Sequence, residues 1–495
     1  MSQQILKKKY CFNTDTDTTT LMFLKKILGI PEDLAGESDI IELFGHHYIP
    51  GIFFISERKK RPNFILPEDN LDYDSWIRNE VKRDLISIVQ ASDLNETIKT
   101  KIRNEFKTIQ DEVISILNYR IHNSKELNEI ISHQEYPDIL RRIISFVLTS
   151  DPEKIFDTYQ EMKKIGKIVA IDIIEQWNDQ IDLYYCLKAS VASGLIGLDM
   201  KSYSAAVSKI YNTSIIPLKC GETIQEKVSK IKEKLEGKIN EPMGIDFWKE
   251  YQKDVLNTDN DIYMASFTDD YIETIFQMKF YEKQLEYNPK LTIHAIPKDS
   301  CYGIDISYDE IIKLLKEPVF TQLKEFFNSG RFLVCSKGPK MGVVNGQKIS
   351  NEVASILKKS DVVDVKGARS YESLQGIQKI AYFGFAICRE ISESVTGIPA
   401  ESGKLVFIRQ DPGIHSFKDF QFRAFKKTKT KSGRIFGLAR LTANEYALQI
   451  QRNNNNLLLE NMCETMSDTY AINKIPIFSK EDGNNKISFS DPSIS

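Results

Sequence analysis

Apolar residues in the N-terminal half of the chain recur at helical spacing. They return every three or four positions from Ile77 to Ile88, after an Asp-Ser pair that suits a helix N-cap, and again from Ile98 to Ile116. Asp151 and Pro152 begin another helical pattern, which continues from about 153 to 210. The heptads are not sustained, so these stripes predict a helical core rather than a coiled coil.

The pattern changes after about residue 255, where short β-like apolar runs alternate with helical segments. The predicted strands are 262–267, 291–296, 331–335, 361–365 and 404–409. The predicted helices are 271–286, 308–316, 319–328, 348–359 and 371–395. Such alternation is typical of a parallel sheet covered by helices on both faces. We therefore predict an α/β fold, in which a helical N-terminal region precedes an α/β/α sandwich with a mainly parallel, Rossmann-like sheet.

The same pattern divides the chain into four parts. Residues 1–210 form the helical N-terminal region, and 211–254 form a charged, lysine-rich stretch of helix and linker. Residues 255–450 form the α/β/α domain. Residues 451–495 are polar and predict a mobile tail.

Charge and composition exclude several functional classes. The 495 residues include 66 basic and 69 acidic side chains, a balance that gives no reason to expect nucleic-acid binding. The start of the chain lacks a secretory signal, and the longest apolar stretch, Ile380 to Cys388, is too short to span a bilayer. The seven cysteines form no CxxC pair, and His46-His47 lies near no cysteine, so neither a disulfide framework nor a classical zinc site is expected. The sequence thus predicts a cytoplasmic protein without a membrane partner.

Polar side chains follow three of the predicted strands. Asp269 and Asp270 come just after 262–267, Asp305 follows 291–296, and Lys366 directly follows 361–365. In open α/β sheets, ligands bind outside the carboxyl ends of the strands. Three carboxylates and a lysine at that edge suit a hard divalent cation and a phosphorylated ligand.

Each of these residues also has a simpler structural explanation. Thr268 or Asp269 could cap the helix at 271–286, and Asp305 could belong to the cap region of the helix at 308–316. A Lys-Gly pair is often a surface turn. The loop at 336–342, with Lys337 and Gly338, could offer backbone N–H groups to an oxyanion, although it lacks P-loop spacing. Their shared placement after successive strands favours a site.

With these motifs, the sequence resembles the metal-dependent damage-control phosphatases, which are also described as protein-glutamate methyltransferase-like. The first motif of that family, Asp-Asn-x-Gly-Glu, corresponds to residues 269–273, with Asp270 for asparagine and Ile272 for glycine. The family's third metal ligand corresponds to Asp305. A later motif, Asp-x-x-x-x-Lys-Gly-x-x-Asn-x-Glu, corresponds to 361–372, and residues 192–199 resemble a degraded version of the family's helix motif Gly-Asn-x-Ile-Asp.

The resemblance covers roughly residues 75 to 415 and implies a metal-dependent phosphatase for a sugar phosphate or nucleotide. Asp269, Asp270 and Asp305 would hold the cation, the first two would also be catalytic, and Lys366 would balance phosphoryl charge. The expected substrate-binding residues are Glu273, Lys337, Gly338, Gly367, Arg369, Ser370 and Glu372. The family implies manganese, cobalt, nickel or magnesium, and all-oxygen ligands favour magnesium or manganese.

Two other functions stay open at this point. One is a carboxyl methyltransferase, which would need an adenosine pocket, although no clear glycine-rich one is present. The other is a binding or regulatory protein that keeps the fold and has an altered site, as the changed first motif allows. No protein partner is indicated by the sequence.

Overall fold

A computed structural model describes the part of the chain on which the fold rests. The described residues are 25–44, 73–90, 95–117, 135–177, 181–201, 224–300, 302–374, 377–387, 402–412, 435–440, 447–452, 475–481 and 484–490. Helices come first: α3 (Glu37–Phe44), α4 (Tyr73–Gln90), α5 (Glu96–Ile116), α7 (Tyr136–Thr149), α8 (Gln160–Glu175), α9 (Leu183–Lys201) and α11 (Ile224–Asn240). Within the described residues, no strand precedes Ile245, so the predicted helical N-terminal region is confirmed.

A seven-stranded sheet forms the centre of the C-terminal part. Its strands are β1 (Ile245–Asp246), β2 (Ile262–Phe267), β3 (Leu291–Ile296), β4 (Phe332–Val334), β5 (Val362–Lys366), β6 (Ile380–Ala386) and β7 (Leu405–Gln410). Their order is β1-β7-β6-β5-β2-β3-β4. Strands β2 to β6 pair in parallel, whereas β7 is antiparallel to β6 and parallel to β1. The predicted, mainly parallel α/β sheet is therefore confirmed.

Helices connect these strands. They are α12 (Trp248–Tyr251), continued by a π-helical turn at Gln252–Leu256, and α13 (Tyr271–Tyr287), α14 (Tyr308–Leu314), α15 (Thr321–Asn328), α16 (Asn351–Lys359) and α17 (Ala368–Leu374). Short 3-10 turns lie at Pro318–Phe320 and Gly346–Lys348. Helix α13 is buried on nearly all sides, as expected for a central helix whose apolar residues do not form one stripe.

The predicted helix at 371–395 is wrong over much of its length. Helix α17 ends at Leu374, and Ile380–Ala386 forms strand β6 beside β5. A short apolar run fits a buried strand as well as a buried helix, so periodicity could not separate them. Gly384 was the overlooked signal, because a Cβ there would lie 2.9 Å from Cγ2 of Val191 in α9. A glycine inside a strand often marks such a close approach.

Two other segments add elements that the sequence pattern did not show. Strand β1 falls within the stretch 211–254 and pairs with β7, so this stretch joins the sheet. Near the C-terminus, β8 (Ile435–Arg440) pairs with β9 (Ala447–Arg452), and β10 (Ile475–Glu481) pairs with β11 (Asn484–Ser490). These hairpins form two separate sheets, and β10 and β11 lie within the predicted tail.

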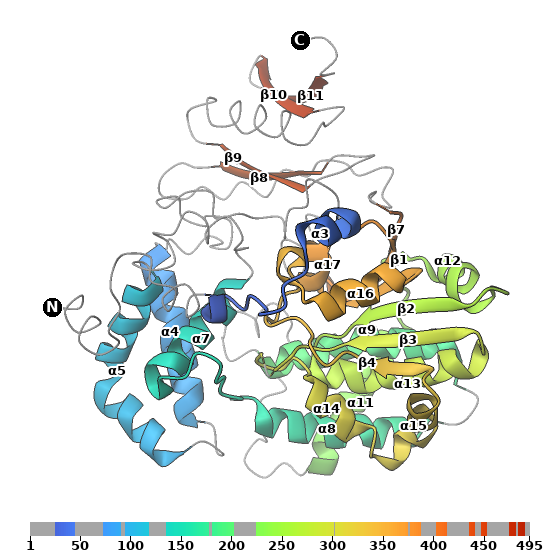
Figure 1. The fold of residues 1–495 in the computed structure, drawn as a ribbon, viewed down its shortest axis with the longest axis horizontal. Helices are drawn as coiled ribbons and strands as arrows, with labels where there is room; N and C mark the ends of the chain where they lie inside the picture. The colour runs from blue at the N-terminus through green and yellow to red at the C-terminus, as the bar shows by residue number, and fades with distance from the viewer. Residues whose placement is uncertain are drawn as a thin grey trace.

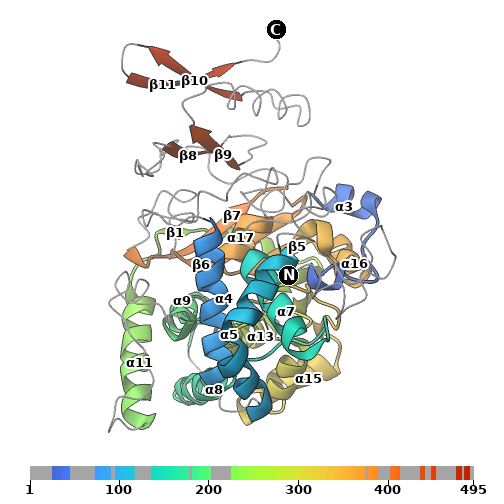
Figure 2. The same ribbon diagram turned by 90° about the vertical axis from the view of Figure 1, so that its left-hand side faces the viewer.

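Helices cover both faces of the main sheet, as Figures 1 and 2 show. On one face, α8, α9, α11, α13 and α15 share a core with residues such as Met264, Ile293 and Ile306. On the other face, α3, α16 and α17 pack on Phe267 and Val365. Packing thus groups α8 and α9 with the sheet, although both lie in the region 1–210.

Helices α4, α5 and α7 form a separate bundle beside the sheet (Figure 1). Their core contains Val81, Ile109 and Ile143, and it also takes in Tyr302 and Met341 from two loops of the C-terminal part. These two loops therefore tie the bundle to the sheet. None of the described helices combines the length and the apolar character needed to cross a membrane.

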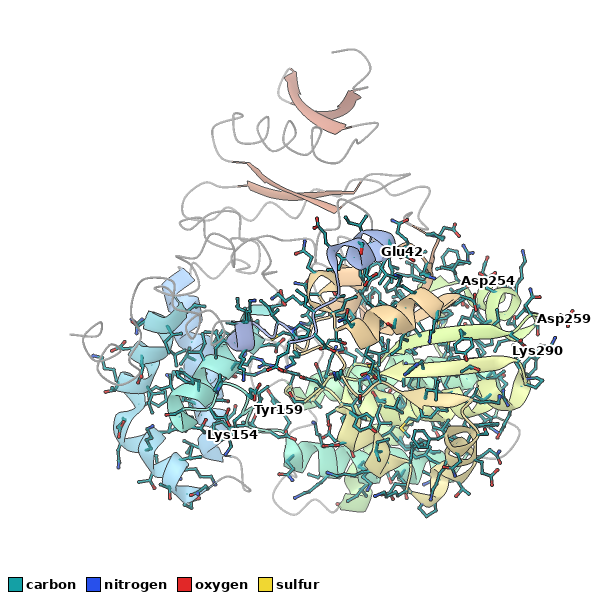
Figure 3. All side chains as sticks on the ribbon, in the orientation of Figure 1. Glu42, Lys154, Tyr159, Asp254, Asp259 and Lys290 are labelled. Carbon is teal, nitrogen blue, oxygen red and sulfur yellow. The ribbon has the colours of Figure 1, made fainter. Side chains whose placement is uncertain are left out.

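The strands point their carboxyl ends towards this bundle. In Figure 3, Asp259 and Lys290, which precede β2 and β3, lie at the far right, whereas Tyr159, which follows α7, lies on the side of the sheet that faces the bundle. The edge at which an open α/β sheet binds ligands therefore faces the N-terminal helices.

Candidate metal centre

Three aspartates meet at the carboxyl ends of β2 and β3. Asp269, Asp270 and Asp305 each offer a carboxylate oxygen, and these oxygens all lie within 4.8 Å of one another. Asp270 and Asp305 are each only 3% exposed. The structure therefore brings together the three side chains that the sequence predicts as metal ligands.

Backbone pairing fixes the distance between two of these aspartates. Asp270 and Asp305 face each other in an isolated antiparallel bridge. The flanking hydrogen bonds run from the Ile306 N–H to the Asp269 carbonyl (3.0 Å) and from the Tyr271 N–H to the Ile304 carbonyl (2.8 Å). Asp270 and Asp305 therefore form the non-hydrogen-bonded type of pair, in which side chains lie closest.

The capping explanations for these residues are wrong. Helix α13 has Asp270 at its N-cap position, and the side chain of Asp270 makes no capping hydrogen bond. Ser307 caps α14, where the Glu310 carboxylate accepts hydrogen bonds from the Ser307 N–H (2.8 Å) and hydroxyl (2.9 Å). The carboxylates thus lie at the start of α13, whose positive end favours negative charge, without acting as its cap.

Two glycines allow close packing around the carboxylates. Gly367 has φ +88°, and a Cβ there would overlap Oδ2 of Asp269. A Cβ at Gly342 would lie 2.8 Å from Oδ2 of Asp305 and 3.0 Å from Oδ2 of Asp138. The carboxylates of Asp305 and Asp138 therefore both pack against Gly342. Their Oδ2 atoms can be no farther apart than the sum of these two distances.

Helix α7 contributes charged side chains that the sequence did not reveal. Asp138 accepts hydrogen bonds from the Gly342 N–H (3.1 Å), from Nη1 of Arg141 (3.1 Å) and from Nη2 of Arg369 (3.3 Å). It is 1% exposed. Asp138 thus connects the helical bundle to the loop over Asp305 and to the predicted substrate residue Arg369. No spacing motif marks Asp138, because only Arg141 is near it in the sequence, whereas Gly342 and Arg369 come from two distant parts of the chain.

Arg141 brings positive charge to the site. Burial lowers the pKa of its guanidinium, but the carboxylates of Asp84, Asp138 and Asp305 outweigh this effect and raise the pKa above its ordinary value. A Cβ at Gly303, two residues before Asp305, would lie 3.2 Å from Nη1 of Arg141. Arg141 therefore stays charged beside the segment that carries Asp305.

Lys366 is buried rather than part of a surface turn. Its ammonium pairs with Oδ1 of Asp364 (3.2 Å), two residues earlier on β5, and its side chain is fully buried. Oδ2 of Asp364 accepts hydrogen bonds from the Ser266 hydroxyl (2.8 Å) and the Gln277 amide (3.2 Å). The charge of Lys366 is thus matched within the core, and its contact with a substrate stays a prediction.

The other predicted substrate residues are placed differently from one another. Lys337 is at the surface, where its ammonium pairs with Asp33 (3.2 Å). Gly338 packs on the carbonyl of Pro297. The hydroxyl of Ser370 is buried without a hydrogen-bond partner among the described residues.

The two predicted glutamates also differ. Glu273 is buried in the first turn of α13, where its Oε2 would lie 3.1 Å from a Cβ on Gly194 of α9. The degraded helix motif therefore does meet the first metal motif. The side chain of Glu372 lies outside the described residues.

Comparison with known proteins adds little to this geometry. No family model matches the sequence, and no curated protein matches it. Among solved structures, the fold is similar to a crystal structure of a DUF89 family protein from Pyrococcus horikoshii, with a TM-score of 0.46 and 16% identity. The match covers 68% of this chain and 96% of the other. A likeness at this level says nothing about activity.

Proposed function

We propose that the protein is a metal-dependent phosphatase for a small phosphorylated metabolite, such as a sugar phosphate or a nucleotide. The observation that supports this proposal best is the cluster of Asp269, Asp270 and Asp305 at the ligand-binding edge of the sheet. Arg141 and Arg369 lie close by through their contacts with Asp138 and would attract an anionic substrate.

The three carboxylates fit a divalent cation. Carboxylates this close repel one another, and burial increases the repulsion unless a positive charge lies among them. Their oxygens are hard ligands, which suit magnesium or manganese. When bound, such a cation supplies Lewis-acid polarisation of a phosphoryl oxygen.

The protein's own residues would then do the positioning. Asp269 and Asp270 would orient the attacking group from the start of α13, and Gly367 would leave room for the Asp269 carboxylate. The guanidinium of Arg369 is held by Asp138 and would lie opposite the negative charge of a substrate that is bound near Asp305. Lys366, next to Gly367 and held in place by Asp364, would balance part of the negative charge on the phosphoryl group.

Metal analysis of an aspartate variant tests the cation. We expect wild-type protein to bind one divalent cation, and Asp305→Ala to weaken binding by more than the about 10- to 100-fold that loss of an outer-shell partner costs. The control is Asp309→Ala, an exposed aspartate four residues away, which should bind the cation like wild type. Equal metal content in wild type and in Asp269→Ala/Asp305→Ala would contradict the proposed site.

A phosphatase screen tests the reaction. Wild-type protein should release phosphate from at least one sugar phosphate or nucleotide with manganese, magnesium, cobalt or nickel, and Asp305→Ala should not. Metal uptake without turnover of any phosphate ester would refute the phosphatase and leave a metal-binding protein.

A further inference from the structure

Lys298, just beyond the end of β3, is a buried lysine whose ammonium has no partner among the described residues. It is 1% exposed. Within the described part of the chain, its ammonium has no hydrogen-bond acceptor and no ion pair. Burial of an ammonium without compensation is costly, so such residues are rarely kept for packing alone.

The other buried lysines of the described residues show that this is an exception. Each of them has a partner within 3.2 Å. The pairs are Lys99 with Glu96, Lys163 with Glu310, Lys188 with the Glu241 carbonyl, Lys348 with Glu135, and Lys366 with Asp364. Among the buried lysines that the structure describes, Lys298 is therefore the one whose ammonium has no partner.

Backbone pairing directs Lys298 towards the aspartates. Its N–H donates to the Ile306 carbonyl (3.1 Å), and its carbonyl accepts from the Tyr308 N–H (3.2 Å), so Lys298 pairs with Ser307 in a parallel bridge. Paired residues project to the same side of a sheet, and so do residues two apart on one strand. Lys298 therefore shares its side with Ser307 and Asp305.

Asp270 shares this side as well, because it pairs with Asp305 in the other bridge. A residue and its diagonal neighbour on the adjacent strand lie about 7–8 Å apart, which a long side chain can cross. The Lys298 ammonium is thus within reach of a ligand that is held at Asp270 and Asp305.

A single loop covers both parts of this arrangement. Gly338 packs so closely on the Pro297 carbonyl that a Cβ would overlap it, and the Asp299 N–H donates to the Pro339 carbonyl (3.1 Å). Four residues after Gly338, Gly342 lies against Asp305. The loop at 336–342 therefore packs both on the segment that carries Lys298 and on Asp305.

We propose that Lys298 binds an anionic oxygen of the substrate, with the metal-binding aspartates on the other side of the bound group. This inference rests on the proposed function and adds the residue that recognises the phosphoryl charge. A lysine suits this task as a compact point charge with three donors. The bound anion would supply the counter-charge that Lys298 lacks among the described residues.

Binding of inorganic phosphate tests the proposal. Titration calorimetry on manganese-loaded and metal-free protein would compare wild type with Lys298→Met and Lys298→Gln. We expect both variants to bind phosphate about 10- to 100-fold more weakly, as for loss of a charged hydrogen bond, with unchanged metal content. The control is Lys290→Met, an exposed lysine before the other end of β3, which should bind like wild type.

Stability separates this role from a structural one. Removal of an unpaired buried charge should leave the denaturation midpoint of Lys298→Met unchanged or higher. Unchanged phosphate affinity in both variants, or no phosphate binding by wild type, would overturn the proposal. If wild type also hydrolyses a phosphate ester with its metal, the proposed function survives that failure. If wild type takes up no metal but still binds phosphate in a way that depends on Lys298, the metal-dependent function is refuted and the role of Lys298 is retained.

Discussion

The carboxyl ends of β5 and β3 each bury a lysine, and the two lysines have opposite surroundings. Lys366 on β5 pairs with Asp364, and its ammonium lies 5.8 Å from the ring centroids of Phe280 and Phe407. Lys298 after β3 has no such partner among the described residues. Both are essentially unexposed, so burial alone does not distinguish a structural lysine from one available to a ligand.

The difference teaches that a motif does not reveal whether the charge of its lysine is already paired. The Lys-Gly motif selects Lys366, whose charge the core already compensates. The buried lysine whose ammonium has no partner among the described residues lies in Ile-Pro-Lys-Asp at 296–299, which matches no motif. Variants of the two lysines test this contrast directly and should show the largest effect. Changes at Gly367, beside Lys366, and at His294 on β3 should have smaller effects.

The largest effect should come from Lys366→Met. Loss of the ammonium leaves the Asp364 carboxylate buried without its counter-charge, which costs about 3–5 kcal/mol of unfolding free energy. Chemical denaturation would measure it, with Lys298→Met as the matched buried lysine, for which no loss is expected. Equal losses in the two variants would remove the contrast.

Lys366→Met should also lower turnover by about 10²-fold, as for one preorganised electrostatic group. Its metal content should change much less than that of Asp305→Ala. Wild-type stability together with lost turnover would show instead that Lys366 contacts the substrate.

Gly367→Ala should have an intermediate effect. The residue has φ +88°, where an alanine is strained by about 1–2 kcal/mol, and its Cβ would also displace the Asp269 carboxylate. Gly330→Ala is the control, because Gly330 has φ +79° with open space around it. Both variants should lose stability, but only Gly367→Ala should lose metal affinity in calorimetry. Equal metal affinity in the two would place Asp269 outside the metal site.

The smallest effect concerns His294 on β3. Burial, helped by Lys359 and opposed by Glu352, lowers the pKa of His294 from 6.5 to about 4. The folded state then binds a proton more weakly than the unfolded state, so this contribution to stability is full above pH 6.5 and is lost as pH falls towards 4.

Denaturation between pH 7 and pH 4 would measure this contribution. His294 is partly exposed, so the effect is reduced by solvent. We expect the unfolding free energy of wild type to fall by about 1 kcal/mol more than that of His294→Gln between pH 7 and pH 4. Parallel curves for the two proteins would show that His294 has the same pKa in the folded and unfolded states.

Much of the fold could be predicted because central strands carry strong local signals. The bounds of β2 and β3 agree with the sequence prediction, since each is an apolar run followed by a polar turn and a helix. Strand β6 was missed because a run buried on both faces has no alternation. Strand β1 has only two residues, too few to show a pattern.

Part of the candidate site could also be predicted from the sequence. Asp269, Asp270 and Asp305 follow strands that are neighbours in the sheet, so the topology brings them together. Asp138 and Lys298 could not be found in this way. Asp138 reaches the site because α7 packs over the loop at 336–342, and Lys298 differs from other lysines only in what surrounds it.

The sequence by itself determined the class of fold and the three carboxylates that gather at one edge of the sheet. These features follow from local periodicity and from the position of polar residues after apolar runs. Only the tertiary structure decided which charges are matched. Compensation of a buried charge often depends on side chains from distant segments, as with Lys348 and Glu135, whereas the Lys298 ammonium has no such partner among the described residues. The local pattern of the sequence contains no information about which distant side chains lie close together.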